Sequence, residues 1–162
     1  MYQAVKMKSQ GFTLLEVMIF TSILSIVLVS MAAFVTRLVY NLRINEHKVY
    51  ANYYASEVQE WLSSEREDGW SDIYAKAGSG AGNTYCLNTN LSFKYVLNDL
   101  PTPPTACSSF DGIIGLSSPK IFKRELKLQQ TTSSTVTATI TVSWNEGSKL
   151  YQEQIQSNYT SY

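Results

Sequence analysis

Two residues near the start of the chain, Gly11 and Glu16, have types and spacing that suit specific chemistry. Gly11 presents bare backbone, which a peptidase can approach closely because no Cβ stands in the way. Glu16 is the only acidic residue in a long apolar stretch, and an acid at membrane depth usually has a partner. A carboxylate and an ammonium group attract each other far more strongly in low dielectric than in water. The front of this stretch therefore suits backbone access at Gly11 and charge pairing at Glu16.

The apolar run behind Glu16 predicts a membrane-spanning helix. No charged side chain occurs from Val17 to Thr36, and Arg37 ends the run. As a helix, these positions extend roughly 30 Å, which is the thickness of the hydrocarbon core of a bilayer. Lys6 and Lys8 precede the run and favour a cytoplasmic start.

The stretch Lys8-Ser9-Gln10-Gly11-Phe12-Thr13-Leu14-Leu15-Glu16-Val17 resembles the prepilin cleavage motif of type IV pilins and type II secretion pseudopilins. The resemblance implies that residues 1–11 are a leader, which a membrane aspartyl peptidase removes by cutting the Gly11–Phe12 bond. It implies methylation of the new amino terminus at Phe12. It also implies that Glu16 neutralises the terminal amine of a neighbouring subunit during assembly.

Two other interpretations of this stretch remain open. Thr13 and Glu16 have the spacing of a capping box, in which both side chains satisfy the first helical amides. Ser30-Met31-Ala32 before Ala33 resembles a secretory signal cleavage site. The apolar region in front of it is longer than that of an ordinary signal peptide, which favours the prepilin interpretation.

The second expected feature is one continuous helix. Neither proline nor glycine occurs from Phe12 to Glu67, so the sequence predicts a helix over residues 12–68 of about 55 residues, with 12–39 as transmembrane segment and filament core. Its second half is amphipathic, and one face should pack on a globular head. The apolar positions expected on that face are Leu38, Leu42, Val49, Tyr53, Tyr54, Val58, Trp61 and Leu62.

The remainder, residues 69–162, predicts a β-rich head. A glycine-rich segment at 77–83 is expected to be a flexible linker. Strands are expected at 84–87, 92–97, 122–128, 135–144 and 149–156, the last two joined by a turn. The expected fold class is therefore α+β and type IV pilin-like, with the long helix packed on a small antiparallel sheet.

Cys86 and Cys107 are the only cysteines, and both fall in the head. Without further cysteines or clustered histidines, zinc binding is not expected. In an oxidising compartment the pair would form a disulfide, with free thiols as the alternative.

Composition argues against several function classes. Without the leader, 11 basic residues face 13 acidic ones, so no nucleic-acid surface is indicated. His47, the only histidine, is expected to be solvated and without metal-binding neighbours. No catalytic constellation occurs, so we expect no enzyme activity, metal or cofactor.

The resemblance implies a structural subunit of a type IV pilus or pseudopilus. The expected partners are the prepilin peptidase, other pilin or pseudopilin subunits, the assembly machinery, and membrane lipid before assembly. The expected location is the cytoplasmic (inner) membrane, single-pass with the head outside the cytoplasm, and then the filament. Residues 51–57 and the Thr141-Val142-Ser143-Trp144 strand look more like minor than major subunits. The alternative is a membrane-anchored adhesin whose helix is a simple tether.

Overall fold

The computed structural model describes residues 13–89, 91, 95–110 and 121–161. The chain divides into two compact units, residues 1–43 and residues 44–162. The leader, Gly11 and Phe12 lie outside the described residues.

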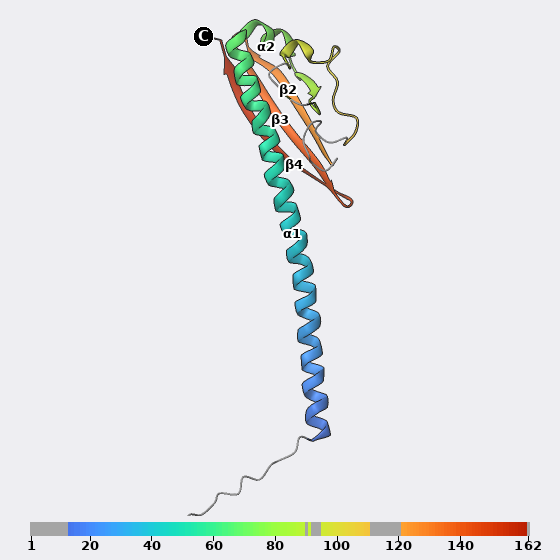
Figure 1. Ribbon diagram of the computed structural model, residues 1–162. Coiled ribbons are helices and arrows are strands. Elements are labelled where there is room, and N and C mark those ends of the chain that lie inside the picture. The colour runs from blue at the N-terminus through green and yellow to red at the C-terminus, as the bar shows by residue number, and fades with distance from the viewer. Residues whose placement is uncertain (1–12, 90, 92–94, 111–120, 162) are drawn as a thin grey trace, which may run out of the picture. The chain divides into compact units, whose positions relative to one another are not determined.

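Helix α1 extends over Leu14–Asp68 without interruption, 55 residues in length (Figure 1). This confirms the long helix predicted from the absence of glycine and proline. Gly69 follows the last helical residue, and its N–H donates to the Glu65 carbonyl at 3.1 Å. A second helix, α2 (Trp70–Lys76), starts directly after it. The sequence interpretation missed α2, because seven residues are too few to show a helical period.

The residue 44–162 unit contains one antiparallel sheet with strand order β1-β2-β3-β4. Its strands are β1 (Asn83–Cys86), β2 (Phe122–Thr132), β3 (Thr135–Glu146) and β4 (Lys149–Thr160). Four of the expected strands are thus present, and β2, β3 and β4 are two to four residues longer than expected. The α+β, pilin-like layout of one long helix packed on a small antiparallel sheet is therefore established.

The expected strand at 92–97 falls partly outside the described residues, because 92–94 are not described. In its described part, Leu97 begins a 3-10 turn (Leu97–Asp99), so no strand is present there. The turn is held locally, since the Val96 N–H donates to Asp99 Oδ2 at 3.0 Å.

The buried face of α1 agrees only in part with the predicted one. Its buried residues are Ala51, Tyr54, Ala55, Val58 and Leu62, spaced by three or four positions. Three of these, Tyr54, Val58 and Leu62, are buried as predicted. Two other predicted residues are not, since Val49 is 68% exposed and Tyr53 is 61% exposed. The small side chains of Ala51 and Ala55 let the sheet approach closely, so the buried face includes two positions that hydrophobicity alone does not mark.

His47 is not solvated, which contradicts the sequence interpretation. Its side chain is 12% exposed, and Nδ1 lies 2.6 Å from Glu146 Oε1. The ring also meets Phe122 edge-on, with centroids 5.7 Å apart. His47 lies one turn before Ala51, so the helix face that packs on the sheet includes it.

The glycine-rich segment after α2 is not a free linker. The Gly78 N–H donates to the Leu128 carbonyl at 3.2 Å, and the Gln130 N–H donates to the Gly78 carbonyl at 2.9 Å. A Cβ on Gly78 would lie 2.5 Å from Asn83 Oδ1, so only glycine fits this close approach without a shift. The segment therefore fastens α2 to β2.

Candidate functional site

The first turn of α1 contains the described part of the cleavage motif. Thr13 precedes the helix, and its Oγ1 accepts a hydrogen bond from the Glu16 N–H at 3.3 Å. The Thr13 carbonyl accepts from the N–H groups of Glu16 and Val17 at 3.0 and 3.2 Å. Thr13 is therefore the N-cap of α1.

The Glu16 half of the capping box does not form. Within the described residues, the exposed Glu16 carboxylate accepts no hydrogen bond and makes no ion pair. The cap thus explains Thr13 and leaves the carboxylate of Glu16 available for a partner.

The apolar half of α1 presents large hydrophobic side chains on all sides. Every residue from Leu14 to Leu42 is exposed, and the large hydrophobic ones include Phe20, Leu24 and Phe34. This helix is long and apolar enough to cross a membrane, by length and composition. It is a candidate membrane span, as expected for an inner-membrane anchor.

Five serine and threonine hydroxyls lie in this apolar segment, and each donates to a backbone carbonyl of the same helix. The Ser22 and Ser25 hydroxyls donate to backbone carbonyls four residues earlier at 2.7 and 2.8 Å. Ser30 and Thr36 do the same at 2.8 and 2.9 Å, and Thr21 donates to Met18 three residues earlier. Because lipid offers no hydrogen-bond partner, this internal pairing makes the segment compatible with a bilayer.

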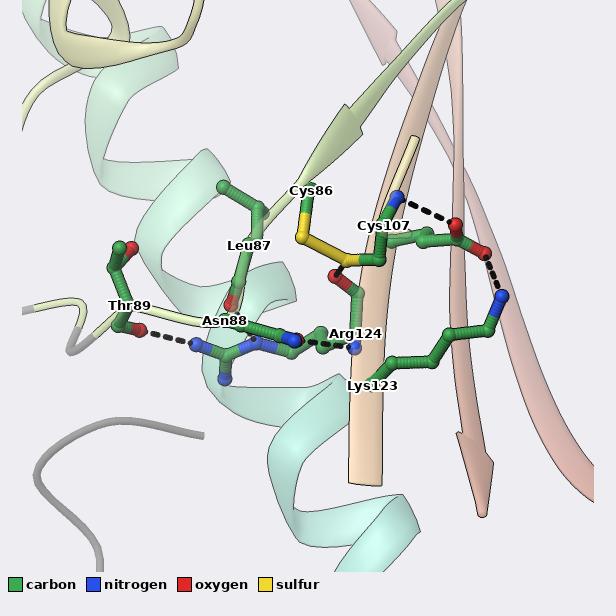
Figure 2. Close-up of a disulfide and its surroundings, with 8 residues drawn as sticks. Cys86, Leu87, Asn88, Thr89, Cys107, Lys123 and Arg124 are labelled. Atoms are coloured by element: carbon green, nitrogen blue, oxygen red, sulfur yellow. Dashed lines mark hydrogen bonds and ion pairs between the residues drawn. A yellow bond between two sulfur atoms is a disulfide. The ribbon is translucent and has the colours of Figure 1, made fainter. Parts of the chain in front are cut away.

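The head is held by a disulfide between Cys86 and Cys107, whose Cα atoms are 4.7 Å apart (Figure 2). The predicted bridge is therefore present in the structure. The Cys107 N–H donates to Glu125 Oε1 at 2.9 Å, and Lys123 Nζ lies 3.4 Å from Glu125 Oε2. The bridge thus joins β1 and the segment before residue 110 to the start of β2.

Arg124, beside this bridge, is fully buried and connects three parts of the unit. Its Nε donates to the Leu87 carbonyl at 3.0 Å and its Nη2 to the Thr89 carbonyl at 2.9 Å (Figure 2). Its Nη1 donates to the Tyr54 carbonyl at 3.1 Å and to Glu57 Oε2 at 2.5 Å. One guanidinium therefore ties β2 to α1 and to the segment after β1.

Burial lowers the pKa of the Arg124 guanidinium, and the Glu57 carboxylate acts in the opposite direction by attracting the cation. The sequence interpretation did not single out this pair. A signal for the pair was present in the sequence. Arg124 lies between Phe122 and Leu126 at a spacing of two, so it shares the apolar side of a predicted strand with them. A charged residue in such a position indicates a buried partner.

Burial also raises the pKa of two tyrosines in this unit. Tyr85 is desolvated in the core, and its hydroxyl donates to the Lys76 carbonyl at 2.6 Å. Tyr95 is desolvated beside Trp61, whose Nε1 donates to the Tyr95 carbonyl at 2.9 Å. In both cases burial disfavours the charged phenolate, so the neutral hydroxyl keeps its proton to higher pH.

The described residues thus define a particular class of protein: a chain with an apolar, membrane-compatible helix half and a disulfide-bonded head of pilin-like α+β layout. Residues 6–32 match the family model described as the prokaryotic N-terminal methylation motif, which is the prepilin-type signature. No curated protein and no solved structure matches the chain at a significant level. The chain therefore carries the prepilin-type signature on a pilin-like fold.

Proposed function

We propose that this chain is a structural subunit of a type IV pilus or a related pseudopilus. The observation that carries the proposal is the methylation motif at residues 6–32, joined to a candidate membrane span. In this proposal the chain enters the cytoplasmic membrane with its head outside. The prepilin peptidase then cuts between Gly11 and Phe12 and methylates Phe12.

The exposed apolar half of α1 supports assembly after processing. A helix that is apolar on all sides is soluble in lipid and equally soluble in a bundle of similar helices. Transfer from membrane to filament core therefore costs little hydrophobic free energy, and an assembly machine can drive it. The role is structural and not catalytic, with other pilin-like subunits as partners.

The Glu16 carboxylate supports the proposed pairing with a terminal amine. Thr13 alone caps the helix, so the cap leaves Glu16 without a local role. We propose that Glu16 accepts the methylated amine of Phe12 from a neighbouring subunit, which removes an unpaired charge from the apolar core. A membrane-anchored adhesin, the alternative, would need no such partner.

Intact-mass measurement of the mature protein tests the proposal. We expect loss of residues 1–11 and the addition of one methyl group, and we expect the mature protein in sheared filaments. Replacement of Gly11 by a bulky residue should leave the precursor uncut. A mature protein that starts at Ala33 would instead support a secretory signal, and a processed protein confined to the membrane would support the tether. The minor role expected from sequence remains a prediction, which the copy number in isolated filaments tests.

A further inference from the structure

A groove of about 390 Å³ lies between the last turns of α1 and the residues Leu91, Tyr95 and Val96. Trp61 and Tyr95 form an aromatic wall, with ring centroids 5.7 Å apart and planes inclined by 52°. The hydrogen bond from Trp61 Nε1 to the Tyr95 carbonyl holds this wall in place. The groove therefore presents a preformed aromatic surface, not a gap between loose side chains.

Four carboxylates line the groove, and they differ in how they are used. Glu57 pairs with Arg124, and Glu65 Oε2 accepts the Leu97 N–H at 2.8 Å. Glu60 and Asp68 are exposed, and neither makes a hydrogen bond or ion pair within the described residues. The groove thus combines an aromatic wall with two carboxylates that are available to an incoming cation.

This combination suits a guanidinium group. A planar guanidinium stacks on aromatic faces and binds carboxylates with directed N–H donors, whereas an ammonium is a compact and strongly hydrated charge. Arg43 offers such a group, because its side chain is exposed and has no ion pair within the described residues. It lies beyond the apolar run, six residues after Arg37.

A second copy, not the same chain, must supply this arginine. Seventeen helical positions separate Arg43 from Glu60, about 25 Å at 1.5 Å per residue, which is far beyond the reach of a side chain. The charges of two copies are complementary. Residues 44–162 contain 12 acidic and nine basic residues, and residues 12–43 contain two basic and one acidic.

We propose that the groove of one subunit binds the Arg43 guanidinium of a second copy, against Trp61 and between Glu60 and Asp68. The inference rests on the proposed filament function and names a contact within it. Two parallel α1 helices displaced by about 25 Å along their length would bring these residues together.

A charge exchange tests the contact in the full chain, in a host that assembles the filament. Arg43→Glu and Glu60→Arg should each lower incorporation into sheared filaments about fivefold or more, because each places like charges together. The variant with both changes should recover to within about twofold of the parent, since every copy then carries the exchanged pair. Asp72→Arg, an exposed acid on α2 outside the groove, is the matched control and should change incorporation little. Failure of the double variant to recover would overturn the proposal.

Photo-crosslinking gives a second readout that needs no altered charge. A benzophenone side chain at Ser64, which lines the groove, should form a dimer adduct with the Arg43 region of another copy. Adducts with a different protein, and none with a second copy, would overturn the assignment. A Ser64 crosslinking variant that forms the dimer adduct, in a chain whose parent never enters filaments, would contradict the filament function alone. A Ser64 crosslinking variant that enters filaments but forms its adducts elsewhere would contradict the groove contact alone.

Discussion

Arg124 Nη1 lies 2.5 Å from Glu57 Oε2, and the Arg124 side chain has no exposed surface. The two residues are 67 positions apart in the sequence, and their contact joins α1 to β2. The guanidinium also binds three backbone carbonyls, those of Leu87, Thr89 and Tyr54. The head is therefore locked to the helix by one buried polar network as well as by its apolar core.

Loss of this guanidinium should destabilise the head strongly. Arg124→Met would leave Glu57 and the carbonyls without their donor, and breaking a buried pair in this way costs about 3 kcal/mol or more. Arg124→Lys should also be destabilising, because one ammonium cannot replace the forked donors. Denaturant unfolding of the full chain in detergent would measure both variants.

Lys127→Met, on the same strand, is the matched control, since Lys127 forms no ion pair in the described part of the chain. We expect its unfolding midpoint to stay close to that of the parent. Equal midpoints for Arg124→Met and Lys127→Met would contradict the role assigned to the network.

The disulfide should contribute stability through chain entropy. Cys86 and Cys107 are 21 residues apart, and closing a loop of this length contributes about 3 kcal/mol in the chain-entropy model. Replacing both cysteines by alanine should lower the free energy of unfolding by that order. The parent measured under reducing conditions should match the variant. Alkylatable thiols in protein from the cell envelope would show that the bridge does not form there.

Substitutions at Glu16 and at Thr13 should have different effects on filament incorporation. Glu16→Leu should preserve insertion and head folding, yet suppress incorporation into filaments about a hundredfold, because a buried ammonium would lose its partner. Thr13→Ala removes the observed cap and should cost about 1 kcal/mol, mostly as fraying of the first turn. The ratio of filament to membrane protein measures both effects. Equal, small defects would assign Glu16 to the cap.

The buried tyrosines should make the head sensitive to alkali. Because burial raises the pKa of Tyr85 above its ordinary value of 10.0, the folded chain keeps a proton that the unfolded chain releases. This contribution to stability is full below pH 10 and is lost as the pH rises through the raised pKa. Tyr85→Phe should therefore flatten the decline in unfolding free energy between about pH 9 and about pH 12. A decline as steep as that of the parent would show that other groups cause it.

Local properties of the sequence determined the elements of this protein. A stretch without glycine or proline produced α1, because nothing in it opposes the backbone bonds of a helix. Alternation of apolar and polar residues placed β2 and β3, because successive side chains on a strand face opposite sides. The cleavage motif could be read in the same way, since it is contiguous, although its Gly11 and Phe12 lie outside the described residues.

Only the tertiary structure decided which surfaces meet. Ala51 and Ala55 are buried while Val49 is exposed, because close approach to the sheet depends on shape as well as on hydrophobicity. His47 contacts the Glu146 carboxylate on β3, and Arg124 contacts the Glu57 carboxylate on α1, both far away in the sequence. Such pairs cannot be assigned from local pattern, because their free energy depends on burial that exists only once distant segments have packed together.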